Sequence, residues 1–170
     1  WYLYMEEIDE VIKTLPFSHM GKSAKADELR SEGISSDILL ENVQTIYQQL
    51  KLEGIKSYIF SNEFIAHSTY SELINKGAKQ INYDHLSDLF VALNKCILKE
   101  FSPSFFYVYW PNIDSQGHNF SPESKEYFME AKFFFDNLYE NFIKGFDREN
   151  ARDIVFMLTS DHGQVSANPI

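Results

Sequence analysis

Residues 105–122 have the sequence FFYVYWPNIDSQGHNFSP, in which an apolar run, a polar cluster and a helix start follow one another. The apolar run at 105–110 comes shortly after the helix-breaking Pro103 and predicts a strand. Ser121-Pro122 has the order of a cap followed by a first-turn proline, so a long helix is expected to begin there. The polar cluster therefore lies just past the end of a predicted strand.

Downstream, the expected helix has apolar residues every three or four positions, which predicts a thick aromatic core face. These residues are Tyr127, Phe128, Ala131, Phe134, Phe135, Leu138 and Phe142. Gly145 is expected to end the helix. The continuous apolar run at 154–158, IVFML, then predicts a strand that is buried on both faces.

Upstream, two more helices and another strand are expected. A helix from Ser35 or Ser36 to about Leu52 precedes a strand at 55–61, and Asp84 is expected to cap a second helix. That second helix has apolar residues at helical spacing: Leu86, Leu89, Phe90, Leu93 and Ile97. Alternating strands and helices predict an α/β fold, a mostly parallel sheet with helices on both faces.

Length and composition limit the domain organisation and the partners. The 170 residues are 44% hydrophobic and are expected to form a single α/β domain, with residues 16–34 as an exposed loop excursion. The formal charge of -10 argues against binding to a nucleic-acid backbone. No apolar run is long enough for a transmembrane segment, and the lone Cys96 excludes an intrachain disulfide. Compartment and oligomeric state stay open.

Two polar clusters follow predicted strands, at the ends where ligands bind in open α/β sheets. The first contains Asp114 and His118, whose four-residue spacing brings a carboxylate and an imidazole to one point of a helical turn. The second contains Asp161 and His162, which can converge on a cation in the turn after the strand at 154–158. Each pair alone is weak evidence for a metal site, since Asp and His at such spacings are common on protein surfaces. Two such pairs at successive strand ends are much harder to explain by coincidence.

Carboxylate and imidazole ligands without thiolates suit Zn2+ or Mn2+. Two pairs at neighbouring strand ends predict two divalent metal ions, of which Zn2+ is the first choice and Mn2+ the second. Ions about 3.5–4 Å apart are suited to in-line displacement at phosphorus. The four predicted metal ligands are therefore Asp114, His118, Asp161 and His162.

Both clusters resemble signatures of the alkaline phosphatase superfamily, in its type I phosphodiesterase / nucleotide pyrophosphatase branch. Residues 114–122, DSQGHNFSP, are similar to that branch's Asp-x-x-Gly-His segment with its following aromatic, small residue and Pro. Residues 160–163 match its Ser-Asp-His-Gly signature, and residues 1–4, WYLY, look like the segment after the nucleophile region in some prokaryotic members. The departures are Ser121, where many relatives have Gly, and Gln164, where Met is frequent; neither is expected to bind metal directly.

The resemblance implies an alkaline-phosphatase-like fold, present in part, and a hydrolase acting on phosphodiester or nucleotide pyrophosphate bonds of a small-molecule or nucleotide substrate. Asp114 and His118 would bind one metal ion, and Asp161 and His162 the other. In the family a Ser or Thr hydroxyl attacks the phosphoester. The resemblance implies that this nucleophile and an early Asp ligand lie upstream of Trp1, and that a late His ligand lies downstream of Ile170. The chain is therefore expected to be an internal portion of a larger catalytic domain and to be inactive alone.

Other readings stay open. Within the superfamily these are a phosphomonoesterase, a phosphotransferase, a mutase and, least favoured, a sulfatase. From another class comes a catalytically incomplete metal-binding or interaction module. His67-Ser68-Thr69 offers a base and hydroxyls, although a polar turn explains it as well.

Overall fold

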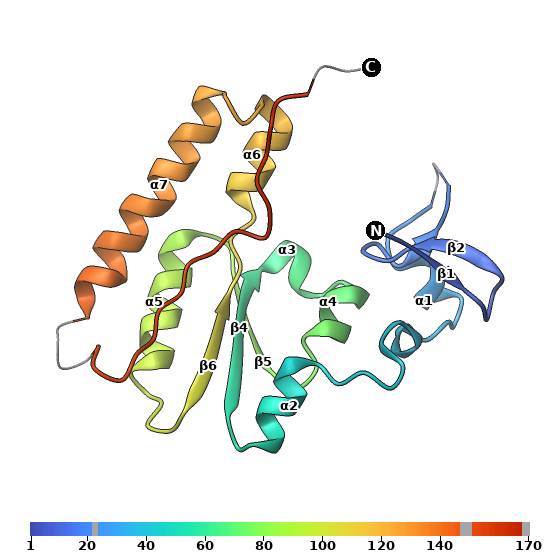
Figure 1. Ribbon diagram of the computed structural model, residues 1–170, viewed down its shortest axis with the longest axis horizontal. Coiled ribbons are helices and arrows are strands. Elements are labelled where there is room, and N and C mark those ends of the chain that lie inside the picture. Colours follow the sequence, from blue (N-terminus) through green and yellow to red (C-terminus); the bar gives the residue numbers. More distant parts are fainter. Residues whose placement is uncertain (22–23, 147–150, 168–170) are drawn as a thin grey trace. The chain divides into compact units, whose positions relative to one another are not determined.

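The computed structural model describes residues 1–21, 24–146 and 151–167 (Figure 1). Its elements are, in chain order, β1 (Tyr2–Met5), β2 (Glu10–Lys13), β3 (Ser18–His19), α1 (Glu28–Ser31), the 3₁₀ helix η1 (Ser36–Leu40), α2 (Ile46–Leu52), β4 (Lys56–Asn62), α3 (Glu63–Ala66), α4 (Thr69–Ile74), β5 (Lys79–Tyr83), α5 (Leu86–Ile97), β6 (Ser104–Val108), α6 (Asn112–Phe120), α7 (Lys125–Asn141) and the 3₁₀ helix η2 (Ile143–Gly145). The chain divides into two compact units, residues 1–83 with 100–109 and residues 84–99 with 110–170.

A parallel sheet forms the centre of the first unit. Its order is β5-β4-β6, with β4 parallel to both neighbours. Ile59 and Phe60 on the middle strand are almost fully buried, as a strand between two neighbours requires. The helices α2 and α3 pack against this sheet. The predicted strands at 55–61 and 105–110 are thus confirmed, and the chain has the expected α/β fold with a parallel sheet and flanking helices.

A small antiparallel sheet, β1-β2-β3, stands at the start of the first unit. Its core consists of Met5, Ile12, Phe17 and Leu29. Because Phe17 and Leu29 are fully buried, the expectation of an exposed loop at 16–34 is wrong for these positions. The segment contains β3 and α1, and its buried residues pack against Ile8, Ile38 and Leu39, which lie outside it in the sequence.

The single helix expected from Ser35 or Ser36 to Leu52 is two helices, η1 and α2. Ser35 does cap the first, accepting a hydrogen bond from the Asp37 N–H. Asn42 then takes a left-handed φ of 61°, and Thr45 starts α2 with a capping box to Gln48. Apolar spacing continues across this break, which is why the periodicity alone suggested one helix.

In the second unit, α5 carries the predicted buried residues Leu86, Leu89, Phe90 and Leu93. The expected cap, however, is displaced by one residue: His85 is the N-cap, not Asp84. The carboxylate of Asp88 closes this helix start by accepting hydrogen bonds from the backbone N–H groups of both residues. The carboxylate at this helix start is therefore that of Asp88 in the first turn, and not that of Asp84 before the helix.

The long helix α7 begins three residues later than the Ser121-Pro122 pattern predicts. Ser121 has a φ of 91° and ends α6, whereas Ser124 caps α7 by accepting from the Tyr127 N–H. The expected aromatic face is only partly buried: Phe134, Leu138 and Phe142 are buried, but Phe128 and Phe135 are exposed. The helical spacing predicted the helix correctly. Which of its apolar residues are buried depends on what packs against the helix, and the spacing does not show that.

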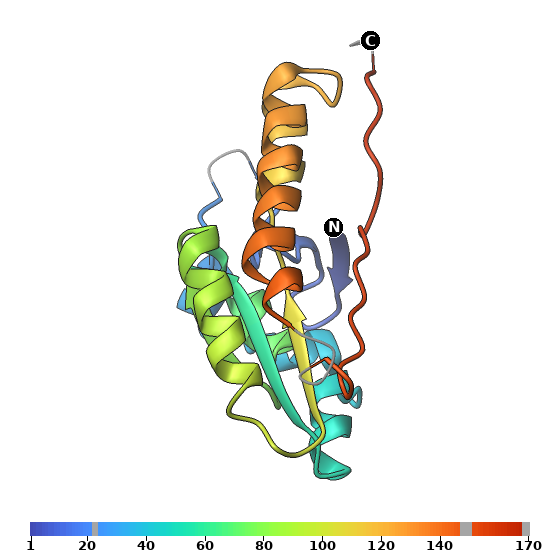
Figure 2. The same cartoon turned by 90° about the vertical axis from the view of Figure 1, so that its left-hand side faces the viewer.

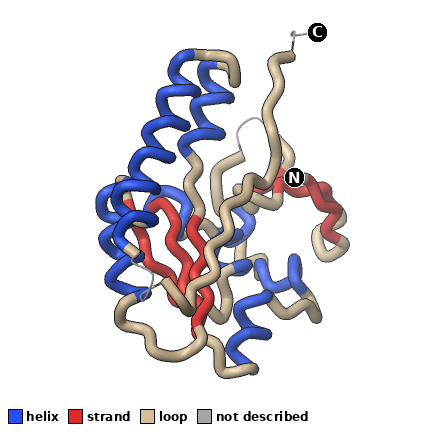
Figure 3. The backbone as a smooth tube through the Cα atoms, turned by 60° about the vertical axis from the view of Figure 1, so that its left-hand side comes forward, coloured by secondary structure: helices blue, strands red, loops and turns tan. Residues whose placement is uncertain are grey.

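Residues 154–158 do not form the predicted buried strand. They run as extended chain without a strand partner in the described residues, drawn as loop in Figure 3 and as part of the red trace in Figure 2. Val155 and Met157 are 89% and 82% exposed, and Phe156 contacts the ring of Phe142. An apolar run becomes a buried strand only when its backbone groups join a ladder, and this one joins none.

None of the helices in the described residues has the length and apolar character needed to cross a bilayer.

Candidate metal centre

Asp114 and His118 lie on α6, one helical turn apart. Their spacing puts both side chains on one face of the helix, with His118 Nε2 3.4 Å from Asp114 Oδ1. The His118 side chain is 71% exposed, and Asp114 is half-buried. The convergence expected from the four-residue spacing is therefore present.

Asp161 and His162 lie on the extended segment that follows residues 154–158. The backbone N–H of His162 donates to Asp161 Oδ1 at 3.1 Å, and His162 Nε2 lies 3.8 Å from Asp161 Oδ2. His162 Nδ1 is 3.1 Å from the Gly163 carbonyl oxygen. Because a carbonyl only accepts, Nδ1 carries the proton and Nε2 of the neutral ring has the free lone pair.

The two clusters meet at the carboxylate of Asp114. His162 Nε2 lies 3.7 Å from Asp114 Oδ1, and the Gln164 side-chain amide donates to the same oxygen at 2.8 Å. A second contact, 3.2 Å between the Ser121 and Ser166 hydroxyls, joins the same two segments further along. The clusters were expected to meet because each follows a strand. The second one instead reaches α6 as extended chain that pairs with no strand of the described residues.

These donors are suited to a divalent metal ion. Two ligand atoms bound about 2.0–2.2 Å from a tetrahedral Zn2+ lie about 3.3–3.6 Å apart. The Asp114–His118 distance of 3.4 Å falls in this range, and the distances from His162 to Asp114 and Asp161 are 3.7 and 3.8 Å. Within residues 1–21, 24–146 and 151–167, no three His, Cys, Asp or Glu side chains are grouped so as to hold one ion. The arrangement consists of pairs, and each pair supplies part of a ligand set.

The alternative nucleophile candidate has structural roles instead. The Ser68 hydroxyl caps α4 by accepting from the Ser71 N–H, and Thr69 is almost fully buried. His67 Nε2 lies 2.9 Å from Asn82 Nδ2. Neither hydroxyl has a recorded hydrogen bond to the imidazole, so the residues form no base and nucleophile pair.

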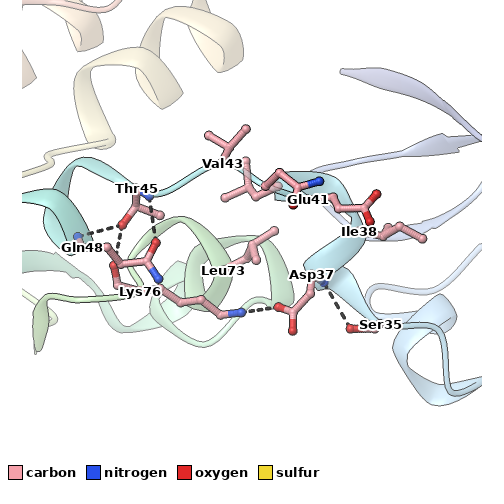
Figure 4. Close-up of a pocket in the computed structure, with 11 residues that line it drawn as sticks. Ser35, Asp37, Ile38, Glu41, Val43, Thr45, Gln48, Leu73 and Lys76 are labelled. Carbon is pink, nitrogen blue, oxygen red and sulfur yellow. Dashed lines mark hydrogen bonds and ion pairs between the residues drawn. The ribbon is translucent and has the colours of Figure 1, made fainter.

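A cavity of about 480 Å³ lies in the first unit, beside η1 and α2 (Figure 4). Asp37 and Lys76 in its lining form an ion pair with each other, and Thr45 and Gln48 exchange the hydrogen bonds of the capping box. Glu41 adds one further carboxylate, but neither a histidine nor any of the four predicted metal ligands lines the cavity. This lining therefore has no counterpart of the Asp and His pairs.

Sequence reasoning missed one residue of this centre, Gln164. The sequence shows it only as a departure from the Met that is frequent in the resembling family, with no metal-binding role. The structure places its amide on Asp114 and its side chain against Gly117. A glycine inside a helix was the available signal, because helices disfavour glycine unless something needs the space.

Comparison with known proteins supports the resemblance carried by these motifs. The model of the type I phosphodiesterase / nucleotide pyrophosphatase family matches residues 20–169, which include both clusters. No curated protein and no solved structure shows significant similarity. Since the family match covers most of the sequence, the chain belongs to the type I phosphodiesterase / nucleotide pyrophosphatase family.

Proposed function

We propose that this protein is a dimetal phosphoesterase that hydrolyses phosphodiester or nucleotide pyrophosphate bonds of small-molecule substrates. The observation that carries the proposal is the Asp114 carboxylate, whose Oδ1 faces His118 Nε2 at 3.4 Å and His162 Nε2 at 3.7 Å. These residues come from the two motifs within the family match. Phosphodiesterase-type activity in general follows from the family; the metals and the roles of the residues are our proposal.

Asp114 and His118 would hold one divalent ion, and Asp161 and His162 the other. Oxygen and nitrogen donors without thiolates suit Zn2+ best and Mn2+ next. Bound ions supply the positive charge that polarises a phosphoryl group and activates an attacking hydroxyl. That hydroxyl, a Ser or Thr, is expected outside residues 1–170.

The acidic character of the chain is compatible with a phosphoester substrate when metal ions are bound. The net charge is -10, and bound cations supply positive charge where a phosphoester anion would bind. The side chains of Asp114 and Asp161 supply negative charge where cations would sit. The Gly163 carbonyl accepts a hydrogen bond from Nδ1 of His162, which leaves Nε2 as the nitrogen that would coordinate a metal ion.

The test uses the natural full-length protein with an activated phosphodiester, and the bound metal is measured by elemental analysis. We expect His118→Ala and Asp161→Ala each to lose bound metal and to reduce hydrolysis by at least about 100-fold, since loss of a ligand exceeds the effect of a supporting residue. The matched control is His67→Ala, which removes a histidine outside the proposed centre and should leave both measurements unchanged.

Full activity in His118→Ala or Asp161→Ala would overturn the site. Metal binding that depends on these residues, without hydrolysis of phosphodiesters or pyrophosphates, would instead favour the metal-binding module over the enzyme.

A further inference from the structure

The side-chain amide of Gln164 makes two contacts with Asp114 on α6. Its Nε2 donates to Asp114 Oδ1 at 2.8 Å and also lies 3.2 Å from the Asp114 backbone oxygen. Its Oε1 is buried and has no hydrogen-bond partner in the described residues. A surface glutamine would keep this oxygen in water, because an unpaired buried amide oxygen is costly. The side chain is therefore held in place by its contacts with the helix.

Gly117 provides the space for that side chain. A Cβ at position 117 would lie 1.6 Å from Gln164 Oε1 and 2.6 Å from its Cδ, closer than non-bonded atoms approach, so the end of the Gln164 side chain would have to move. The backbone at Gly117 has no left-handed φ, so the glycine matters here for the placement of Gln164 and not for the helix geometry. A glycine of the first motif is thus complementary in shape to a glutamine that directly follows the second motif.

The contact also orients Asp114. Its Oδ1 receives the Gln164 amide and faces both histidines, whereas no contact to Oδ2 is found within the described residues. A hydrogen bond to one oxygen restricts the rotation of a carboxylate and so helps to orient it toward a ligand.

We propose that Gln164 is a positioning residue, which docks residues 160–164 onto α6 through Gly117 and fixes the Asp114 carboxylate for a divalent metal ion. The metal part of this inference rests on the proposed function; the docking part concerns the protein without metal. The two parts are tested separately.

Docking is tested by a double-mutant cycle in metal-free protein, using the thermal midpoint of unfolding and the NMR signals of the Gln164 side-chain amide. Gly117→Ala should lower the midpoint and move the amide signals toward those of exposed glutamines, because the new methyl group displaces Gln164. In the Gln164→Ala background the same Gly117→Ala change should leave the midpoint unchanged or raise it, since alanine favours the helix. Equal shifts in both backgrounds would overturn the docking.

Positioning is tested by the affinity of the natural full-length protein for Zn2+ alone, measured by calorimetry. We expect Gln164→Ala to weaken binding about 10–100-fold, the range for residues that orient a metal ligand. Gln164→Met fills the same space beside Gly117 but donates no hydrogen bond to Asp114. It should therefore weaken Zn2+ binding, but several-fold less than Gln164→Ala does. Val165→Ala, at a neighbouring exposed position, should match the unmodified protein.

The outcomes separate the two proposals. Unchanged Zn2+ affinity in Gln164→Ala, with binding lost in His118→Ala, would overturn the positioning role and leave the proposed function standing. If the unmodified protein binds no Zn2+ or Mn2+, the proposed function and the positioning role both fail, and the docking is judged by the double-mutant cycle alone.

Discussion

His19 joins three parts of the small N-terminal sheet region through one side chain. It lies on β3, and its Nδ1 is 2.6 Å from Glu10 Oε2 on β2, while its Nε2 is 2.9 Å from Glu32 Oε2 at the end of α1. Both partners are carboxylates, which stabilise a proton on each ring nitrogen. The hydrogen bonds that His19 donates to Glu32 and, second in size, to Glu10 raise its pKa to about 9, although desolvation opposes the change.

This raised pKa predicts a loss of stability in alkaline solution. The folded-state pKa exceeds the ordinary value of 6.5, so the contribution of His19 is complete below pH 6.5 and is lost as the pH rises through about 9. In urea unfolding, the midpoint of the unmodified protein should fall more between about pH 6 and pH 10 than that of His19→Gln. A histidine titration by NMR that places the His19 midpoint near 6.5 would contradict the prediction.

At the level of elements, the turn before β5 is packed against the helix α2. Gly77 in this turn has a φ of +100°, and a Cβ there would lie 2.6 Å from the backbone nitrogen of Gln48. Gly54, after α2, also has a positive φ, +74°, but a Cβ there would meet nothing within 4 Å. The two glycines therefore share a backbone requirement and differ in the space around them.

Alanine substitutions at these glycines should separate backbone strain from steric collision. Gly54→Ala should lower the free energy of unfolding by about 1–3 kcal/mol, the cost of a left-handed residue with a side chain. Gly77→Ala should cost more, about 3 kcal/mol or above, because the backbone of α2 must also move. Urea unfolding of both variants measures the difference, and equal losses would show that α2 yields without cost.

Local signals specified some elements well and others poorly. The strand β4 and the helix α5 were predicted from apolar runs and helical spacing, because each signal lies within the element itself. The division between η1 and α2 depends on Asn42 and on the capping box of Thr45, which override a continuous apolar stripe. The helix α7 is capped by Ser124 and not by the predicted Ser121, because Ser121 ends α6. The apolar spacing downstream of Ser121 gives no sign of where the preceding helix ends.

For the whole molecule, strand pairing should determine which backbone amides exchange their hydrogens slowly. The strand β4 has hydrogen-bonded neighbours on both sides, whereas residues 154–158 have no strand partner in the described part of the chain. Amides of β4 should be among the slowest to exchange, and those of residues 154–158 should exchange at nearly unprotected rates. Strong protection at 154–158 would show that this apolar run is paired in solution, contrary to the structure.

The candidate site was predictable in its residues because its chemistry is local. Asp114 and His118 are one helical turn apart, and Asp161 and His162 are adjacent, so each pair was visible in a few letters of sequence. The distance between the pairs was not visible. It depends on how residues 159–166 lie along α6, and the expected reason, a strand at 154–158, is not what brings them there.

The sequence by itself determined the fold class, the family and the four candidate ligands, because periodicity and short motifs are properties of neighbouring residues. Only the tertiary structure decided that Phe17 and Leu29 are buried, that residues 154–158 have no strand partner among the described residues, and that Gln164 lies on Asp114 against Gly117. Each of these depends on contacts between residues distant in the chain. Burial, strand pairing and the fit of a side chain over a glycine are set by which surfaces meet, and a local pattern does not specify the partner.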